Sequence, residues 1–326
     1  MSRPVAPRAS LLALLLTAAV AVPTARADDW PTFRGAARTG VAPDTNLLEK
    51  WPEGGPKLLW KAEGAGRGYA SPAIAGNRLY TLGDGLSTAG DKDEYLSCFD
   101  RATGKQIWRC PQEGCRGAGH SSIVISTVGG RKVYVQTTAS GACGVDAATG
   151  KLLWSYPIDQ TTAVIPTPIV RGDLVFFSAG YRRGGALLKQ VATGDGVKME
   201  EVYGLIQDLA NKHGGIVLVG DHLYGDSDDQ GIPFCAELAT GKQAWKSRGS
   251  GKGSAAVTAA DGHVYFRYQD GTLALVKADP KGFEEVSTFK IPDSDARPSW
   301  AHPVILDGRL YLREQDAILC YDITAG

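Results

Sequence analysis

Basic and aromatic side chains recur beside short β-rich runs of this chain, and their types suggest recognition of an anion. Guanidinium and ammonium groups bind carboxylates through charge-assisted hydrogen bonds, and aromatic rings stack on planar groups or on cations. Three of the five histidines, His120, His213 and His302, lie just before such runs or at their start. We therefore expect these residue types to form a basic and aromatic binding face.

The candidate residues fall into two sets. The first set precedes the first strand of each predicted unit and consists of Tyr69, His120, Lys212, His213, Lys252, Trp300 and His302. The second set follows the second strand and consists of Gln136, Tyr181, Arg182, Arg183, Asp226, Arg267, Tyr268, Arg313 and Glu314. Loops at both positions emerge on one face of the fold derived below, where binding residues concentrate. We expect Arg267, Arg313, Lys252 and Trp300 to form a cradle there for an anionic ligand.

Structural roles compete with binding for several of these residues. The three histidines can instead cap loop carbonyls, and the pairs Arg267-Tyr268 and Arg313-Glu314 can form ion pairs between neighbouring sheets. The run Asp226-Ser-Asp-Asp229 resembles part of a calcium loop, but the glycine and distant glutamate of an EF-hand are missing. We expect a solvated acidic turn at this run.

The chain carries no motif for covalent, phosphate or zinc chemistry. Gly119-His-Ser-Ser lacks the Gly-x-Ser-x-Gly elbow, no glycine-rich phosphate loop follows a strand, and no His-Glu-x-x-His sequence occurs. The sequence therefore assigns no catalytic residue and predicts no metal site.

A repeated phrase defines the elements that must position the candidate residues. It reads Asp100-Arg-Ala-Thr-Gly-Lys-Gln-Ile-Trp108, Asp146-Ala-Ala-Thr-Gly-Lys-Leu-Leu-Trp154 and Glu237-Leu-Ala-Thr-Gly-Lys-Gln-Ala-Trp245, with a weaker copy at Ala192-Thr-Gly-Asp195. The turn glycines Gly104, Gly150, Gly194 and Gly241 are 46, 44 and 47 residues apart, a period typical of one repeated supersecondary unit. Each copy predicts a hairpin, because the acidic residue closes a turn, the glycine takes a positive φ, and the tryptophan begins the next strand.

Two further runs rich in Val, Ile, Tyr and Phe precede each turn, so each unit is predicted to be a four-stranded antiparallel meander. Six units fit, with inner strands starting near Ser71, Ser121, Thr167, Gly214, Ser254 and His302. The last unit lacks its fourth strand, whereas Lys57-Leu-Leu-Trp60 is an apolar strand without a unit. Pairing the two would close a ring and remove exposed edges. The sequence thus predicts an all-β, six-bladed β-propeller closed by an N-terminal strand; an open solenoid would leave Trp60 without a blade.

The beginning of the chain resembles an export signal. Two arginines precede the apolar stretch Leu11 to Val22, and Ala25-Arg-Ala27 follows as a small-x-small cleavage sequence. We expect a signal peptide over 1–27, an N-terminal extension over 28–56 and a single propeller domain over 57–326, in a periplasmic or secreted protein. Removing residues 1–27 takes away three arginines and leaves 32 basic against 35 acidic residues, so no nucleic-acid partner is expected. No membrane span is expected, and Asp28 stands where a lipid anchor would need a cysteine.

The six cysteines divide into two groups. Cys98, Cys143, Cys235 and Cys320 lie at or near equivalent repeat positions, which whole sheets would separate, so we expect four small buried hydrophobic residues. Cys110 and Cys115 flank a short loop, and a bridge between them and two free thiols remain equal alternatives.

The Asp-x-x-Thr-Gly-Lys-x-x-Trp phrase resembles the repeat of the PQQ-like β-propeller superfamily, which includes quinoprotein alcohol dehydrogenases and BamB outer-membrane assembly proteins. The segments Asp29-Trp-Pro-Thr-Phe-Arg-Gly35 and Trp51-Pro-Glu-Gly-Gly-Pro-Lys-Leu-Leu-Trp60 are similar to exported members of that superfamily. The resemblance implies the fold over the mature chain. It also implies PQQ with calcium as a cofactor, if the chain is an enzyme.

This chain departs from the superfamily in three respects. Members usually close eight blades, whereas six units are counted here, and a smaller ring has a narrower axial channel. Adjacent cysteines at the cofactor are absent, and the family's calcium ligands and catalytic aspartate have no matching positions. Two functions remain: a non-catalytic module that binds an exported protein, peptide or glycan on its funnel face, and a PQQ-dependent alcohol or sugar dehydrogenase.

Overall fold

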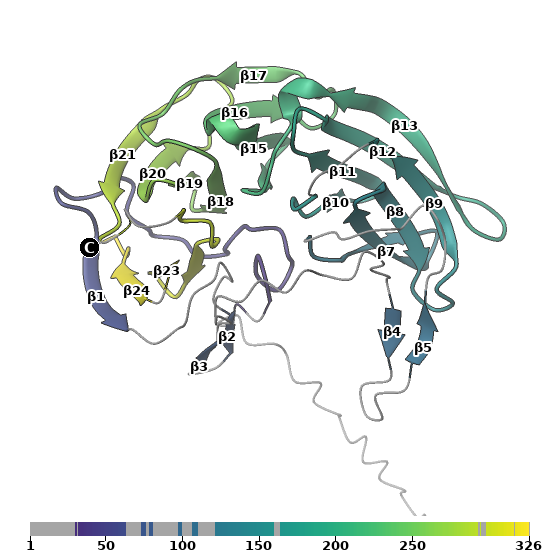
Figure 1. The fold of residues 1–326 in the computed structure, drawn as a ribbon, viewed down its shortest axis with the longest axis horizontal. Helices are drawn as coiled ribbons and strands as arrows, with labels where there is room; N and C mark the ends of the chain where they lie inside the picture. The colour runs from purple at the N-terminus through teal and green to yellow at the C-terminus, as the bar shows by residue number, and fades with distance from the viewer. Residues whose placement is uncertain are drawn as a thin grey trace, which may run out of the picture.

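The computed structural model describes residues 30, 32–62, 73–75, 78–80, 97–99, 106–109, 121–159, 164–292, 294, 298–315 and 317–325. Strands make up nearly all the regular structure of these residues, apart from two short 3-10 turns at Gln207–Leu209 and Asp228–Gln230. The strands form five four-stranded antiparallel sheets and two two-stranded sheets. The four-stranded sheets are arranged around a common centre (Figure 1), which confirms the predicted all-β propeller.

Each four-stranded sheet is one blade, and we number the blades 2 to 6 along the chain. Blade 2 contains β6 (Val124–Val128), β7 (Arg131–Thr138), β8 (Gly141–Asp146) and β9 (Leu152–Pro157). Blade 3 contains β10 (Ile169–Arg171), β11 (Leu174–Ala179), β12 (Gly184–Ala192) and β13 (Val197–Ile206). Blade 4 contains β14 (Ile216–Val219), β15 (His222–Ser227), β16 (Ile232–Glu237) and β17 (Gln243–Lys246). Blade 5 contains β18 (Ala255–Ala260), β19 (His263–Tyr268), β20 (Thr272–Lys277) and β21 (Glu285–Lys290).

Blade 6 is built from both ends of the described chain. Its strands are β22 (Val304–Leu306), β23 (Arg309–Glu314), β24 (Ala317–Asp322) and β1 (Lys57–Ala62), in the order β1-β24-β23-β22. Trp60 pairs with Cys320 and Lys61 pairs with Leu319 in the antiparallel ladder. The predicted closure by an N-terminal strand is therefore confirmed.

The first predicted unit is represented by two separate strand pairs. One pair is β2 (Ala73–Ala75) with β3 (Arg78–Tyr80), and the other is β4 (Ser97–Phe99) with β5 (Gln106–Arg109). Within the part of the chain that the structure describes, these pairs do not join into one sheet. The inner strands of the five blades begin one to three residues after the predicted positions.

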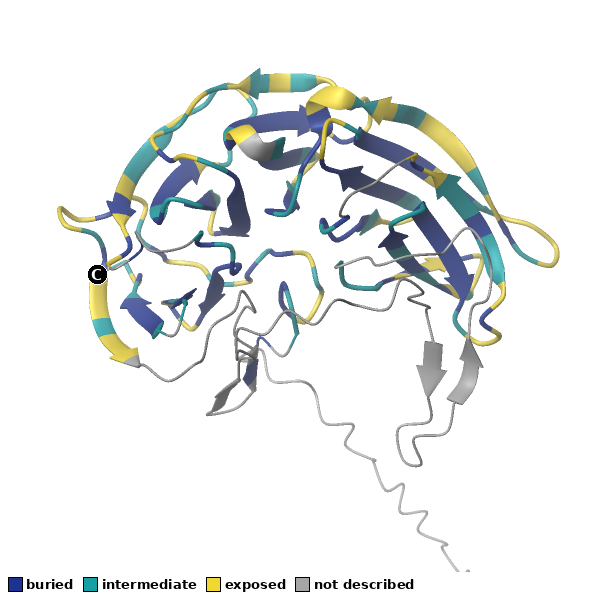
Figure 2. Ribbon diagram, in the orientation of Figure 1, coloured by how far each residue is buried: buried dark blue, intermediate teal, exposed yellow. Residues whose placement is uncertain are grey.

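The strands of a blade differ in burial. Strands β8 and β18 are buried at every position, and β18 lies between strands of blades 4 and 6. The outer strands β13 and β17 lie on the rim and consist mainly of exposed and half-buried residues (Figures 1 and 2). In β17 half-buried and exposed positions alternate, as in a strand with one solvated face.

The repeated phrase forms the predicted hairpin between the third and fourth strands. The Oδ1 atom of Asp146 accepts hydrogen bonds from the backbone N–H groups of Ala148 and Thr149, each at 2.9 Å, and Gly150 has φ +73°. Arg131 donates to the other carboxylate oxygen of Asp146. These three donors hold the pKa of Asp146 below its usual value despite desolvation.

The tryptophans of the repeat pack between blades, as expected. Trp154 is 6% exposed in a hydrophobic cluster shared by blades 2 and 3, and its indole N–H donates to Oε1 of Gln190 at 3.1 Å. Trp245 reaches from blade 4 to the carbonyl of Asp279 in blade 5, at 2.8 Å. The side chain of Trp108 lies outside the described part of the chain.

Residues 32–42, which we call the axial segment, lie inside the ring, where Figure 1 shows the purple chain. Its end runs beside β18, since the backbone N–H of Ala42 donates to Ala259 and that of Ala259 donates to Gly40. The chain then leaves past the turn at Asp261, whose carboxylate accepts the N–H of Leu47 at 2.7 Å. The segment and its continuation therefore connect the centre of the ring to β1 on the rim.

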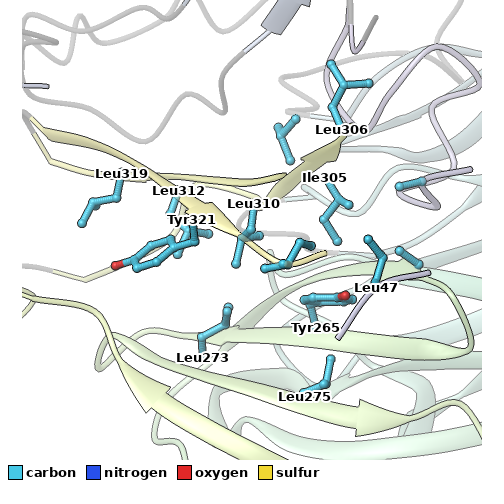
Figure 3. Packing of buried hydrophobic residues seen from close by; sticks show 14 of the residues in the cluster. Leu47, Tyr265, Leu273, Leu275, Ile305, Leu306, Leu310, Leu312, Leu319 and Tyr321 are labelled. Carbon is cyan, nitrogen blue, oxygen red and sulfur yellow. The ribbon is translucent and has the colours of Figure 1, made fainter. Parts of the chain in front are cut away.

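The largest hydrophobic cluster joins blades 5 and 6 to this N-terminal region. Figure 3 shows Leu47 near Tyr265 and Ile305, with Leu312 and Tyr321 on the blade-6 side. Trp51 packs edge-on against Phe289 at a ring-centroid distance of 5.7 Å. Burial of these large side chains fastens the N-terminal region to blades 5 and 6. Strand β1 itself is held by its backbone ladder with β24, since Leu58 and Trp60 are about 40% exposed.

The cysteine expectation needs one correction. Cys235 and Cys320 are free and buried, as expected. Cys143 is buried in β8 but is disulfide-bonded. The expectation is therefore wrong for Cys143, because its sulfur is covalently linked and does not pack as a free thiol. The expectations for Cys98, Cys110 and Cys115 concern side chains outside the described residues.

Candidate functional site

The loops that precede the inner strands and those that follow the second strands meet on one face, the funnel face. The loop after β11 packs against the loop before β14: a Cβ added at Gly180 would lie 2.6 Å from the Cα of Lys212. The Nζ of Lys212 lies 5.2 Å from the ring centroid of Tyr181, a cation–π geometry. The structure thus brings two candidate residues from different blades together.

Tyr181 and Arg182 are presented by a loop with a restrained backbone. Both residues have positive φ values, +57° and +65°, which are unfavourable for residues with a Cβ. Their N–H groups donate to the carboxylate of Asp228, at 2.9 and 3.0 Å. Asp228 therefore fixes a conformation in which Tyr181 is 39% exposed and Arg182 is also exposed.

His213 and Trp300 form a second contact, between blades 4 and 6. Their ring centroids are 4.8 Å apart, and the indole N–H of Trp300 donates to Oε1 of Gln269 at 3.0 Å. Both residues are half-buried, so part of each ring faces solvent. Lys252 is exposed, and its carbonyl accepts a hydrogen bond from Asp270.

The predicted cradle is not built around Arg267. Its side chain is fully buried, and Nη2 lies 2.7 Å from Oε2 of Glu314 in the neighbouring blade. The guanidinium also donates to the carbonyls of Ala301 and Arg313. Burial lowers the pKa of Arg267, and the negative charge of Glu314 opposes that effect. The cradle expectation is wrong for this residue because its charge is neutralised between the blades, as the competing ion-pair interpretation predicted.

Three other candidates are buried with Arg267. Arg313 is 1% exposed and donates from Nε to the carbonyl of Gln315 at 3.1 Å, and Tyr268 is buried with its ring stacked on Phe266. Glu314 is 4% exposed and also accepts a hydrogen bond from the Ser299 hydroxyl at 2.5 Å. These residues hold the seam between blades 5 and 6.

His302 is buried on the axis of the ring rather than displayed on the face. It is 5% exposed and packs edge-on against Phe33, with ring centroids 4.8 Å apart. Desolvation and the charge of Arg34 lower its pKa to about 3, so the imidazole is neutral at ordinary pH. Tyr69 and His120 lie outside the described residues.

Asp226 belongs to a buried network that the sequence did not reveal. It is fully buried at the end of β15, accepting the N–H of Ala255 at 3.0 Å and the side-chain amide of Asn211 at 2.7 Å. Burial raises its pKa to about 8, although these donors act in the opposite direction. The expected solvated turn is therefore wrong for Asp226, whose carboxyl bridges blades 4 and 5. The indication available from the sequence was that Asp226 belongs to the second set of candidate residues.

Arg34 is a second buried group that was not among the candidates. It is 2% exposed, and its Nη2 donates to the carbonyls of Thr39 and Ile216, at 2.9 and 2.6 Å. Desolvation lowers its pKa to about 10. A Cβ at Gly215 would overlap Nη1 of this arginine, so glycine is required there. Arg34 thus fastens the axial segment to β14.

The described residues contain no group of three or more His, Cys, Asp or Glu arranged to hold a metal ion. Among the same residues, no helix is long and apolar enough to cross a membrane.

Comparison with known proteins gives a family match and several similar solved structures. A family model described as outer membrane protein assembly factor BamB matches residues 31–247. A europium-containing methanol dehydrogenase is similar with a TM-score of 0.46 and 12% identity, over 88% of this chain and 69% of that chain. A quinohemoprotein alcohol dehydrogenase from Comamonas testosteroni is similar with a TM-score of 0.48 and 14% identity, over 87% and 57% of the two chains. BamB from Moraxella catarrhalis has a TM-score of 0.38 and 13% identity, over 87% and 97%. No curated protein sequence matches this chain.

Proposed function

Because this chain belongs to the family of the outer membrane protein assembly factor BamB, we propose that it is a non-catalytic propeller that binds an exported partner on its funnel face. The partner is an acidic protein, peptide or glycan. The observation that carries this proposal is the display of Arg182 and Tyr181 beside Lys212 by a loop that Asp228 holds in place.

The composition of this surface supports recognition of negative charge. Arg182 and Lys252 are exposed, and Lys212 is half-buried against an aromatic ring. The ring of Tyr181 restrains the ammonium group of Lys212. A carboxylate of the partner would therefore bind a cation that is already positioned. The ring contact of His213 with Trp300 extends the apolar part of the surface toward blade 6.

Binding to two defined polyanions, poly-L-glutamate and polygalacturonate, tests this proposal. Replacing both Arg182 and Lys212 with Ala should weaken binding to at least one of them by about tenfold or more, because each charge-assisted contact contributes about 1.5–3 kcal/mol. The matched control replaces Lys189 and Lys198, two exposed lysines on β12 and β13 of blade 3. Equal losses in both variants would show a net-charge effect and would contradict a funnel-face site.

The alternative function, a PQQ-dependent dehydrogenase, requires groups that clamp a planar tricarboxylate. The residues expected to do this do not fit the cofactor. Arg267 is paired with Glu314, and Arg313 is 1% exposed. Of the four expected cradle residues, Lys252 and Trp300 remain near solvent. Titrating the mature protein with PQQ and calcium should therefore give no saturable absorbance change and no dye reduction with an alcohol. Saturable binding with turnover would favour the dehydrogenase.

Export to the periplasm or the exterior is part of the same proposal. It is supported by the pattern of basic, apolar and small residues over 1–27. Expression in a bacterial host should give a mature protein whose first residue is Asp28, as N-terminal sequencing would show. A protein that keeps residues 1–27 and stays in the cytosol would contradict this part.

A further inference from the structure

A cavity of about 590 Å³ lies between the axial segment and the inner strands of blades 2 to 4. Its walls are mainly apolar and include Val124, Ile125, Pro168, Ile169, Val170 and Leu218. Small-molecule sites are typically cavities of this size, with apolar walls and a few polar groups that orient the ligand. None of the residues that line it is one of the basic or aromatic candidates of the funnel face.

Ile125 gives the cavity wall an open apolar surface. It lies on the inner strand β6 between buried neighbours and is 56% exposed, more than any other large described hydrophobic residue. Its side chain adds to the apolar wall of the cavity, which an apolar ligand would bury.

Among the described residues that line the cavity, Arg38 carries the one charged side chain. Its Nη1 donates to the carbonyl of Ile123 at the start of β6, which fixes the guanidinium at the wall. Among the described residues, the structure shows no carboxylate partner for this side chain. Arg38 also has φ +58°, a value that is unfavourable for a residue with a Cβ.

The axial segment positions Arg38 by contacts at both of its ends. The buried guanidinium of Arg34 anchors it to β14, and the backbone of Gly40 accepts the N–H of Ala259. The N–H of Arg38 itself donates to the carbonyl of Gly35 at 2.8 Å, which closes a turn. The arginine therefore stands on a short, restrained loop facing an apolar wall.

We propose that this cavity binds a small amphiphilic monoanion, with the apolar body against β6, β10 and β14 and the anionic head on Arg38. A single guanidinium balances a single negative charge, so a compact monocarboxylate matches the site better than a polycarboxylate. The apolar walls supply affinity in proportion to the area buried, and the charge-assisted contact supplies orientation. This site does not depend on the funnel-face function.

Calorimetric titration with octanoate, 1-octanol and the dianion suberate tests the proposal. The wild-type protein should bind octanoate more tightly than either of the other two. Arg38→Ala should weaken octanoate binding by about tenfold or more, because the contact it removes is charge-assisted. The same variant should bind 1-octanol as the wild type does, which also shows that the cavity has kept its shape.

Two matched controls separate this site from general effects. Lys189→Ala removes an exposed cation of β12 that does not line the cavity and should leave octanoate binding unchanged. Ile125→Trp should fill the cavity and abolish binding of octanoate and octanol, whereas Val202→Trp, at a 46% exposed position on the rim strand β13, should not. Unchanged octanoate affinity in Arg38→Ala or Ile125→Trp would overturn the proposal, as would a wild type that binds no octanoate.

Discussion

Arg267 and Glu314 show that charged residues at the ends of second strands can hold two blades together instead of binding a ligand. Both side chains are almost fully buried, and the guanidinium makes hydrogen bonds to two carbonyls in addition to the carboxylate. Removing one member of such a pair leaves an uncompensated charge away from water, which is more costly than the pair is favourable.

Replacing Arg267 with Ala should therefore lower the free energy of unfolding by about 3–5 kcal/mol, as measured by chemical denaturation. Poly-L-glutamate binding by the folded fraction should not change. Arg182→Ala, which removes an exposed arginine, should show the reverse pattern. If Arg267→Ala lost polyanion binding but kept its stability, the prediction that Arg267 belongs to a binding cradle would stand.

Asp226 should make the stability of the protein depend on pH. Its folded pKa of about 8 lies above the ordinary value for aspartate. Between about pH 4 and pH 8 the folded protein keeps a proton that the unfolded chain has released. The free energy of unfolding should thus fall as the pH rises through this window, by at most about 1.4 kcal/mol per pH unit.

The isosteric variant Asp226→Asn cannot ionise, so its free energy of unfolding should depend less on pH in this window. This expectation holds even if the variant is less stable than the wild type at every pH. Denaturation at a series of pH values gives the comparison. An identical slope in both proteins would assign the pH dependence to other groups.

At the scale of the element, the hairpin of the repeated phrase joins neighbouring blades through its tryptophan. Trp154 donates to Gln190, and Gln190 donates to the hydroxyl of Ser126, at 2.6 Å. The Trp154 indole thus takes part in a series of buried hydrogen bonds that connects blades 2 and 3, in addition to its apolar contacts.

Trp154→Ala should leave a cavity between blades and destabilise the fold by about 3–5 kcal/mol. Trp300→Ala should cost much less, because Trp300 is only half-buried on the funnel face, but it should alter ligand binding. Thermal denaturation and polyanion titration of both variants make the test. Equal destabilisation would mean that Trp300 belongs to the core.

Strand positions were predictable from the sequence because they follow from a local periodicity. The hairpins, the inner-strand starts and the pairing of Trp60 with the last blade each needed only the repeat and the rule against free edges. The exposure of a loop side chain does not follow from that pattern. The sequence assigns Arg182 and Arg267 to the same predicted loop set. In the structure Arg182 lies in the loop after β11 and faces solvent, whereas Arg267 lies in β19 and faces a glutamate in the next blade. The cavity beside Arg38 was also not predictable, since the sequence does not show where the axial segment lies.

At the scale of the whole molecule, β1 and the axial segment hold the ring together from its rim and its centre. Deleting residues 28–60 should remove most of β1 and the axial segment at once, exposing the edge of β24 and the inner strands. The truncated protein should lose cooperative unfolding and aggregate, as calorimetry and light scattering would detect.

The control for this deletion is Leu58→Ala, which changes a 41% exposed side chain of β1 without removing the strand. This variant should unfold cooperatively, close to the wild type. A truncated protein that melts like its parent would contradict the closure described for blade 6.

The pairing of β1 with β24 also fixes an order of events during biosynthesis. Residues 57–62 emerge from the ribosome long before residues 317–322, so blade 6 cannot be completed until β24 has been made. Non-local pairing of this kind slows folding and leaves unpaired strands available for aggregation in the meantime. A nascent chain that stalls before β24 therefore cannot close the ring, because a complete blade 6 can form only after β24 has been translated.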